Sequence, residues 1–260
     1  MLKKQIVIVI TATLLSAVTF AEQAATEHEH AEHHAAHHAH WAYDGSNGPD
    51  HWSDLDAKFA TCYTGKNQSP INLTHFTDAE LSPIKFNYQA GGDEVVNNGH
   101  TIQVNYAAGS TITLNGQTFE LKQFHAHAPS ENQINGKSFP MEAHFVHADE
   151  HGNLTVIAVM FEEGAANAEL AKAWQAMPEE EGKSAKLSEN VLGTAVMPES
   201  TAYYRFSGSL TTPPCSEGVI WLVMKQPVTA SKEQIEKFAH AMHHPNNRPV
   251  QPTNARLILE

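Results

Sequence analysis

The sequence predicts a mainly β fold of the α+β class, contained in one domain over residues 41–260. Three observations support this prediction. Short segments in which polar and apolar residues alternate recur along the chain, and turns rich in Gly, Asn and Pro separate them. Helical patterning is confined to two segments. The range contains neither an internal repeat nor a linker long enough to divide it, and all-β domains commonly reach this length alone.

The first 21 residues are typical of a secretory signal peptide. Lys3 and Lys4 precede an apolar run that ends in Thr19-Phe20-Ala21, which has small residues at both positions that determine cleavage. A membrane anchor needs about 20 apolar residues, whereas this run is shorter and contains Thr and Ser. We therefore expect residues 1–21 to be removed and the protein to be periplasmic or secreted, without a stable membrane anchor.

A low-complexity segment follows at residues 22–40, with the sequence EQAATEHEHAEHHAAHHAH. It offers almost no apolar side chains to a core, so we expect a disordered tail. Its seven histidines fit capture of zinc or another divalent metal. A purification tag is one alternative, although tags are uninterrupted runs of histidine. A merely solubilising acidic tail is another, and the sequence leaves it open.

The chain is acidic, with a formal net charge of −13 at pH 7. Removal of the two lysines in the signal peptide makes the charge more negative. A strongly acidic surface argues against nucleic acid and anionic membranes as partners.

Two cysteines occur in the chain, Cys62 and Cys215. In an exported protein, two cysteines indicate one disulfide. The bond would close a loop of about 150 residues, for which the chain-entropy model gives a stabilisation of about 4–5 kcal/mol. Two reduced, buried thiols are the alternative.

Nine segments of alternating character are expected to be strands. They are residues 85–88, 94–97, 101–106, 111–114, 118–127, 141–147, 154–162, 203–208 and 219–224. The two segments with helical patterning are residues 166–177 and 231–242. In the second helix Ser231 is a candidate N-cap, and Gln234 follows three residues later, as in a capping box.

The expected strand at 118–127 places two histidines on one of its faces. His125 and His127 are two residues apart, and side chains with this spacing leave a strand on the same side. Gln123 shares this face. A turn-rich segment follows, in which Asn135-Gly136 is the strongest hairpin signal. The next strand should therefore run back antiparallel beside the first.

This second strand begins near Phe139 and carries a third histidine. Glu142, His144 and Val146 share one of its faces, so antiparallel pairing would bring His144 opposite the first two histidines. His147 lies an odd number of residues from His144 and faces away. We assign it no binding function.

Three neutral imidazoles at one point, with no fourth protein ligand nearby, are typical of an open zinc site rather than a closed structural one. Gln123 and Glu142 each lie two residues before a histidine on the same face, where they could accept the second N–H of the imidazole. In a His-rich chain such spacings also arise by chance. The agreement of faces across two neighbouring strands favours a metal site.

Two blocks around these histidines resemble the α-carbonic anhydrases, and the chain is similar to the exported bacterial type. The blocks are Gln123-Phe124-His125-Ala126-His127 and the run from Ser130-Glu131-Asn132 to Glu142-Ala143-His144-Phe145-Val146. Further similar blocks follow the family's order: Trp41-Ala42-Tyr43, Asn47-Gly48-Pro49, Gln68-Ser69-Pro70-Ile71-Asn72, Asn97-Asn98-Gly99-His100, Ser207 to Pro214 and Asn247 to Pro252. The resemblance covers residues 41 to about 256.

The resemblance implies a large, mostly antiparallel, twisted central sheet with a few peripheral helices. It implies the reversible hydration of carbon dioxide to bicarbonate and a proton by a zinc-bound hydroxide, with Zn²⁺ held by His125, His127 and His144. The small-molecule partners would be carbon dioxide and bicarbonate. A homodimer is left open as the assembly.

The resemblance also assigns roles to individual residues. Thr211 is similar to the threonine that accepts the proton of the hydroxide, and Glu131 to the carboxylate that accepts the threonine's proton. His100 matches the position of a proton shuttle, for which an imidazole has a suitable pKa. The Ser69-Pro70 and Pro213-Pro214 bonds are expected to be cis. The residues that resemble the substrate pocket are Val146, Val156, Leu210, Thr212, Val219 and Trp221.

One competing hypothesis is an exported zinc-binding or metal-buffering protein that uses the His-rich tail, with the domain as a scaffold. Another is a carbonic anhydrase-like binding module without catalysis. Such a module should lack a metal ligand or the relay pair, yet His125, His127, His144, Glu131 and Thr211 are all present.

Overall fold

The computed structural model describes residues 40–89 and 91–260. One compact unit spans Ala39–Glu260. The predicted signal peptide at residues 1–21 and all of the His-rich tail except His40 lie outside the described residues. Within them, no helix combines the length and the apolar character that crossing a bilayer would require.

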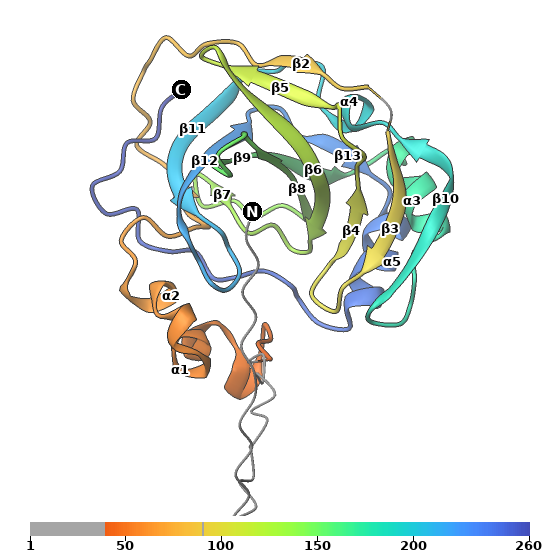
Figure 1. Cartoon of the computed structure of the whole chain (residues 1–260), viewed down its shortest axis with the longest axis horizontal. Coiled ribbons are helices and arrows are strands. Elements are labelled where there is room, and N and C mark those ends of the chain that lie inside the picture. The colour runs from red at the N-terminus through yellow and green to blue at the C-terminus, as the bar shows by residue number, and fades with distance from the viewer. Residues whose placement is uncertain (1–39, 90) are drawn as a thin grey trace, which may run out of the picture. The chain divides into compact units, whose positions relative to one another are not determined.

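A mixed sheet of eleven strands forms the centre of this unit (Figure 1). Its strands are β2 (Lys85–Asn87), β3 (Gly92–Asn97), β4 (Ile102–Asn105), β5 (Thr111–Leu114), β6 (Gln117–His127), β8 (Met141–Ala148), β9 (Leu154–Glu163), β10 (Lys183–Val191), β11 (Tyr203–Ser209), β12 (Glu217–Met224) and β13 (Val228–Ala230). The main order is β10-β3-β4-β6-β8-β9-β12-β11, and β5 pairs with β2 and β6. All pairs are antiparallel except those of β12 and β13 with β9. The predicted mainly β fold with a mostly antiparallel sheet is confirmed.

The helices are few and lie outside the sheet. They are α1 (Trp52–Leu55), α2 (Thr61–Thr64), α3 (Ala168–Gln175), α4 (Gly193–Val196) and α5 (Lys232–Met242). Both predicted helices are present, as α3 and α5. In α5 the Ser231 hydroxyl accepts from the backbone N–H of Gln234, whose side chain accepts from the N–H of Ser231, so the capping box is confirmed. Trp174 of α3 packs against Phe238 of α5, with ring centroids 5.6 Å apart.

All nine predicted strands are present with small differences at their ends, but four strands were not predicted. Three of these are short: β1 (Asn72–Leu73) and β7 (Gln133–Ile134), which pair with each other, and β13. The fourth, β10, is nine residues long and largely exposed at the edge of the sheet. Its sequence, KSAKLSENV, does not alternate clearly because neither face is fully buried. The strand exists through its pairing with β3.

The pair β6–β8 separates an apolar face from a polar one. Phe124 lies opposite Phe145 in the register, and their ring centroids are 5.0 Å apart within the main core. His125 lies opposite His144. Because side chains alternate along a strand, the packing that buries the phenylalanines turns these histidines to the other side. The core therefore sets the direction of the site residues.

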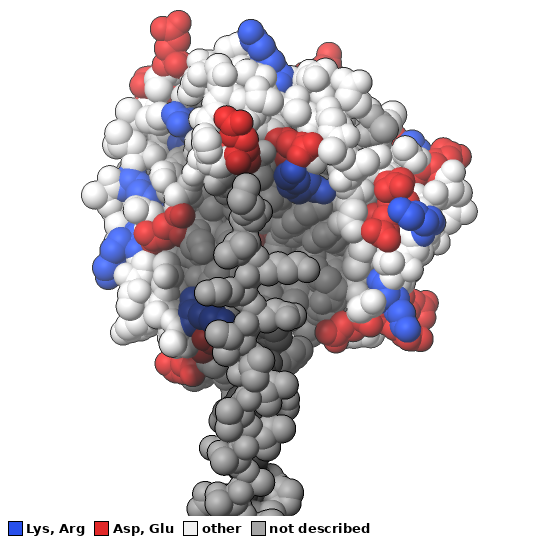
Figure 2. Space-filling model, viewed as in Figure 1, with Lys and Arg blue, Asp and Glu red and all other residues white. Residues whose placement is uncertain are grey.

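Cys62 and Cys215 form the predicted disulfide. The expected cis bonds at Ser69-Pro70 and Pro213-Pro214 are present, and Ala128-Pro129 is a third that was not predicted. Acidic and basic side chains are interspersed over the face shown in Figure 2, so this face presents mixed charge rather than a basic surface.

Candidate metal centre and active site

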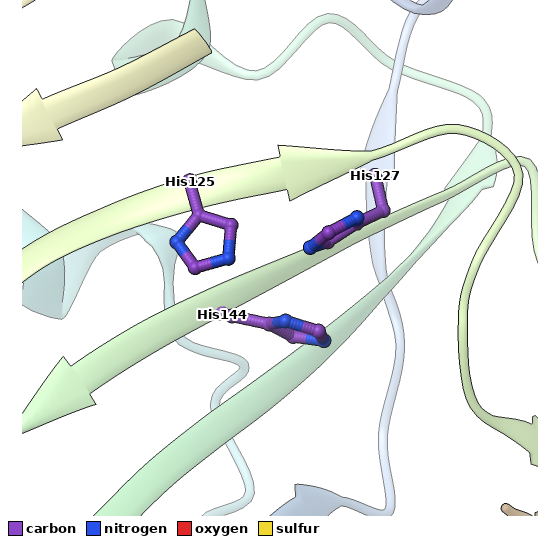
Figure 3. A group of neighbouring side chains, drawn as sticks. All are labelled: His125, His127 and His144. Atoms are coloured by element: carbon purple, nitrogen blue, oxygen red, sulfur yellow. The ribbon is translucent and has the colours of Figure 1, made fainter. Parts of the chain in front are cut away.

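Three histidine rings converge between neighbouring strands (Figure 3). His125 and His127 come from β6 and His144 from β8. One ring nitrogen from each lies within 4.8 Å of the others. The predicted face assignment and antiparallel pairing therefore bring the three imidazoles together.

In both histidines of β6, Nδ1 donates a hydrogen bond to a protein oxygen. His125 Nδ1 donates to Gln123 Oε1 at 2.8 Å, and His127 Nδ1 donates to the Asn246 carbonyl at 2.6 Å. In a neutral imidazole a protonated Nδ1 leaves a lone pair on Nε2. Both Nε2 atoms are therefore available as ligands.

In His144 the two ring nitrogens have the opposite roles. Its Nε2 donates to Glu142 Oε1 at 2.9 Å, which leaves the lone pair on Nδ1. Glu142 is itself fixed, since Oε2 accepts from the backbone N–H groups of Glu131 and Asn132, and Oε1 accepts from Asn132 Nδ2. This network orients the third imidazole.

The electrostatic environment keeps the three rings neutral. Burial is the main cause that lowers the pKa of His125, His127 and His144, and the neighbouring rings lower the pKa of His125 and His144 further. His127 Nε2 is buried and has no hydrogen-bond partner among the described residues. An unpartnered buried lone pair is costly unless something binds it. Within the part of the chain that the structure describes, the cluster consists of these three histidines, and three neutral nitrogen ligands fit Zn²⁺ with one open position.

A buried carboxyl group adjoins this cluster. Glu131 Oε2 lies 3.6 Å from His127 Nε2 and 3.9 Å from His144 Nδ1. Burial raises the pKa of Glu131 to about 8, while the backbone N–H of Arg248 and the nearby Thr211 side chain act in the opposite direction. The structure therefore brings Glu131 and Thr211 together beside the histidines.

Two supporting residues were not predicted. Asn246 accepts from His127 through its carbonyl, and its side chain binds the backbone of Ala126 and Ala128. Arg248 donates its backbone N–H to Glu131 Oε1 at 2.8 Å. A sequence signal existed for Arg248, which stands in the block 247–252. The partners of both residues lie more than 100 positions away.

The buried guanidinium of Arg248 ties this segment to the N-terminal part of the domain. It donates to Gln68 Oε1, the Ser69 carbonyl and the Cys62 carbonyl at 2.8–2.9 Å. Burial lowers the pKa of Arg248 to about 10, and Glu131 opposes this effect. The backbone N–H that supports Glu131 is thus held in place by several contacts.

A cavity of about 150 Å³ leads to the histidines. It is lined by Trp41, Tyr43, Asn98, His100, Thr101, Gln103, Gln123, His125, His127 and Thr212. Of the predicted pocket residues, Thr212 is among these. Val146, Val156, Leu210, Val219 and Trp221 belong to or pack against a second apolar cluster. The Trp221 ring lies 4.8 Å from the His144 ring, so this cluster adjoins the site.

His100 lies in the cavity wall and is partly buried. Its ring stacks on Trp41, with centroids 3.7 Å apart and planes 10° apart. Burial chiefly lowers the pKa of His100; His40 and His244 lower it further, and Glu181 raises it. The side chain therefore lines the same cavity as His125 and His127 and is partly exposed.

Known proteins similar to this chain include several carbonic anhydrases. Residues 47–260 match the model of the eukaryotic-type carbonic anhydrase family. A carbonic anhydrase of Pectobacterium atrosepticum is 53% identical over 220 residues, which are 85% of this chain and 90% of that protein. A carbonic anhydrase of Neisseria gonorrhoeae is 49% identical over 252 residues, 96% of each chain.

Solved structures agree. The α-carbonic anhydrase from Thermovibrio ammonificans, in a complex with the inhibitor sulfanilamide, superposes with a TM-score of 0.84 at 51% identity. The match covers 85% of this chain and 99% of that one. The chain belongs to the eukaryotic-type, or α, carbonic anhydrase family.

Proposed function

We propose that this chain is an exported zinc carbonic anhydrase that catalyses the reversible hydration of carbon dioxide to bicarbonate and a proton. One observation carries the proposal above all others: three neutral imidazole lone pairs meet beside the Glu131–Thr211 pair at the end of a cavity. Membership of the family supplies the reaction.

His125 and His127, through Nε2, and His144, through Nδ1, would hold the zinc ion. A zinc ion there would lower the pKa of water to about 7, the value established for carbonic anhydrases as a class, and so supply a nucleophile at neutral pH. Gln123, Glu142 and the Asn246 carbonyl keep the ligand rings in place by accepting their outer N–H groups.

Thr211 and Glu131 orient the attacking oxygen. The Thr211 hydroxyl accepts a hydrogen bond from this oxygen and donates a hydrogen bond to Glu131. A lone pair of the attacking oxygen therefore faces the carbon of the substrate. This role requires Glu131 to be ionised. A dication on the neighbouring histidines would favour the carboxylate and oppose the rise in pKa that burial causes.

The second apolar cluster supplies the wall against which carbon dioxide rests. Carbon dioxide is small and uncharged, so contacts with Val146, Val156, Leu210, Val219 and Trp221 can hold it without a charged group. Burial of these side chains also keeps competing water away. Thr212, in the cavity lining, lies at the polar side.

His100 takes up the proton that each hydration releases. A group with a pKa near 7 can release protons directly to water at only about 10³ s⁻¹, because its reprotonation cannot exceed a diffusion limit of about 10¹⁰ M⁻¹s⁻¹. Faster turnover needs a relay from the cavity to buffer. The partly buried His100, in the cavity lining, is placed for this step.

Export is supported by the disulfide, since such bonds persist in oxidising compartments. The predicted signal peptide agrees with it. The alternative function, metal buffering by the His-rich tail, is not favoured. It gives no role to the Glu131–Thr211 pair or to the cavity that leads to the histidines.

Stopped-flow measurement of carbon dioxide hydration by residues 22–260, with bound zinc quantified in the same samples, tests the proposal. We expect fast hydration and about one tightly held zinc ion per chain, and loss of both in His125→Ala. The exposed His151→Ala is the matched control and should resemble the parent. Bound zinc without hydration would mean that the protein handles metal instead.

A further inference from the structure

A row of hydrogen bonds connects the cavity wall to a carboxylate on a neighbouring strand. Gln103 of β4 lines the cavity and lies opposite His125 in the register. Its Nε2 donates to Asn105 Oδ1 at 2.6 Å, and Asn105 Nδ2 donates to Glu94 Oε2 at 2.9 Å. Glu94 belongs to β3 and lies directly opposite Asn105. Among the described residues, only Gln103 of these three contributes to the cavity lining.

The carboxylate determines the direction of both amides. A primary amide has an acceptor oxygen and a donor nitrogen, so Asn105 and Gln103 could each face either way on their own. A carboxylate accepts hydrogen bonds and donates none. Asn105 must therefore direct its Nδ2 to Glu94 and its Oδ1 to Gln103. Gln103 must then direct its Nε2 to Asn105, and its Oε1 stays without a hydrogen-bond donor among the described residues.

An acceptor in the cavity wall suits the passage of protons to His100, which lines the same cavity. The cavity volume of about 150 Å³ has room for several water molecules. A water that passes a proton along accepts a hydrogen bond from the side of the histidine cluster and donates one towards His100. Its second O–H needs an acceptor, which Gln103 Oε1 can supply. An amide N–H in this place would instead occupy the second lone pair and disfavour the protonated water.

Building on the function proposed above, we propose that Glu94 is a positioning residue for proton transfer to His100. Acting through Asn105, it holds Gln103 with the amide oxygen towards the cavity, where this oxygen accepts the second O–H of a relay water. The water gains a proton on one side and loses another towards His100, so it is unchanged after each transfer. No other reactant takes part, and Glu94 itself touches neither the substrate nor the zinc ligands.

Charge reversal at this position should invert the row. In Glu94→Lys the new ammonium group donates and cannot accept, so Asn105 would turn its oxygen to it and Gln103 would turn its nitrogen to the cavity. Adding Asn105→Asp should restore the original direction, because the new carboxylate accepts from both the ammonium group and Gln103. The matched control is Asp93→Lys, the same charge change at the preceding residue of β3, whose side chain leaves the strand on the other face.

Steady-state hydration is measured in a high concentration of a buffer too bulky to enter the cavity, so that transfer from His100 to buffer is fast and kcat reports the steps within the cavity. We expect kcat to fall roughly fivefold in Glu94→Lys, the effect of about one hydrogen bond. It should return close to the parent's value in the double variant and stay there in the control. Bound zinc and kcat/KM should not change in any variant, because kcat/KM reports the steps up to hydration.

Neutron diffraction from deuterium-exchanged crystals of the parent protein gives a readout that does not depend on activity. Deuterium distinguishes an amide nitrogen from an oxygen, and we expect the deuterated nitrogen of Gln103 to face Asn105. A nitrogen that faces the cavity would contradict the proposal.

Three kinetic results would also contradict the proposal: an unchanged kcat in Glu94→Lys, an equal loss in Asp93→Lys, or no recovery in the double variant. A joint loss of zinc and kcat/KM in Glu94→Lys would contradict it too, since Glu94 would then support the metal site rather than proton transfer. A parent chain without hydration would instead overturn the proposed function itself.

Discussion

The two faces of the β6–β8 pair use buried histidines in different ways. His144 and His147 lie three residues apart on β8, and both are buried. His147 Nε2 lies 2.7 Å from the Tyr88 hydroxyl, and its Nδ1 donates to the Thr155 carbonyl at 3.3 Å. Protein groups therefore satisfy both nitrogens of His147. On the other face His127 Nε2 is buried and has no such partner in the described part of the chain.

The comparison shows what distinguishes a binding histidine from a structural one. Burial lowers the pKa of His144 and of His147 alike, so neither burial nor a neutral ring separates them. The difference lies in the second nitrogen. On the site face one nitrogen of His144 lies within 4.8 Å of the ligand nitrogens of His125 and His127; on the back face the second nitrogen of His147 completes a hydrogen bond with Tyr88.

The largest effect on activity among variants that keep the zinc ligands is expected at the orienting pair. Thr211→Val keeps the size of the side chain but removes the hydroxyl that accepts and donates hydrogen bonds. Glu131→Gln removes the carboxylate that accepts from this hydroxyl. Positioned proton acceptors contribute about 10²- to 10⁴-fold to rate. We therefore expect kcat/KM to fall at least about 10²-fold in each variant, with zinc content retained. Stopped-flow hydration with zinc analysis checks this, and a loss below tenfold would contradict the assigned roles.

On the back face the expected effect is on stability. The pKa of folded His147 is about 4, below the ordinary 6.5, because the ring is buried. Between these values the unfolded chain binds more protons, so His147 contributes stability above pH 6.5 that is lost as pH falls towards 4. The amount is about 3 kcal/mol. His147→Gln should flatten the fall of the unfolding free energy over this window, measured by urea titration. If the unfolding free energy of the variant changed with pH as steeply as that of the parent, the assigned role of His147 in stability would be wrong.

A smaller effect is expected from the group that holds His125. Gln123→Leu removes the acceptor of the His125 Nδ1 proton. Loss of such a partner typically costs 10- to 100-fold in metal affinity. Competition with a chromophoric chelator should show this weakening of zinc binding. Gln117→Leu, at the exposed start of β6, is the matched control and should bind zinc like the parent.

The smallest effect is expected at His100, which acts after hydration. His100→Ala should lower kcat roughly tenfold in dilute buffer and leave kcat/KM unchanged. Added imidazole should restore the rate because it replaces the missing acceptor. If His100→Ala had the same kcat as the parent in dilute buffer, the assignment of His100 as the proton shuttle would be wrong.

Local patterns in the sequence predict much of this molecule. Period-two alternation locates β6 and β8 and puts His125, His127 and His144 on the same face of the sheet, because the pleat determines side-chain direction. Gln123 and Glu142 follow from the same rule. The capping box predicts the start of α5, since its two hydrogen bonds are local.

Features that depend on distant partners could not be predicted in this way. β10 is exposed and has no clear alternation, and only its pairing with β3 makes it a strand. Asn246 and Arg248 belong to a segment without regular structure, yet they hold His127 and Glu131 across more than 100 residues. Such contacts leave no periodic signal in the chain.

The zinc affinity of His144→Ala and of His147→Ala, measured side by side with the parent, tests the central claim most directly. Both substitutions remove a buried imidazole from β8, and only one of them removes a free lone pair from the site. We predict that His144→Ala weakens zinc binding by more than about 100-fold, beyond the cost of losing an outer partner. His147→Ala should keep one zinc ion at nearly the parent's affinity while losing stability. Equal zinc affinities in the two variants would contradict the assignment of the site.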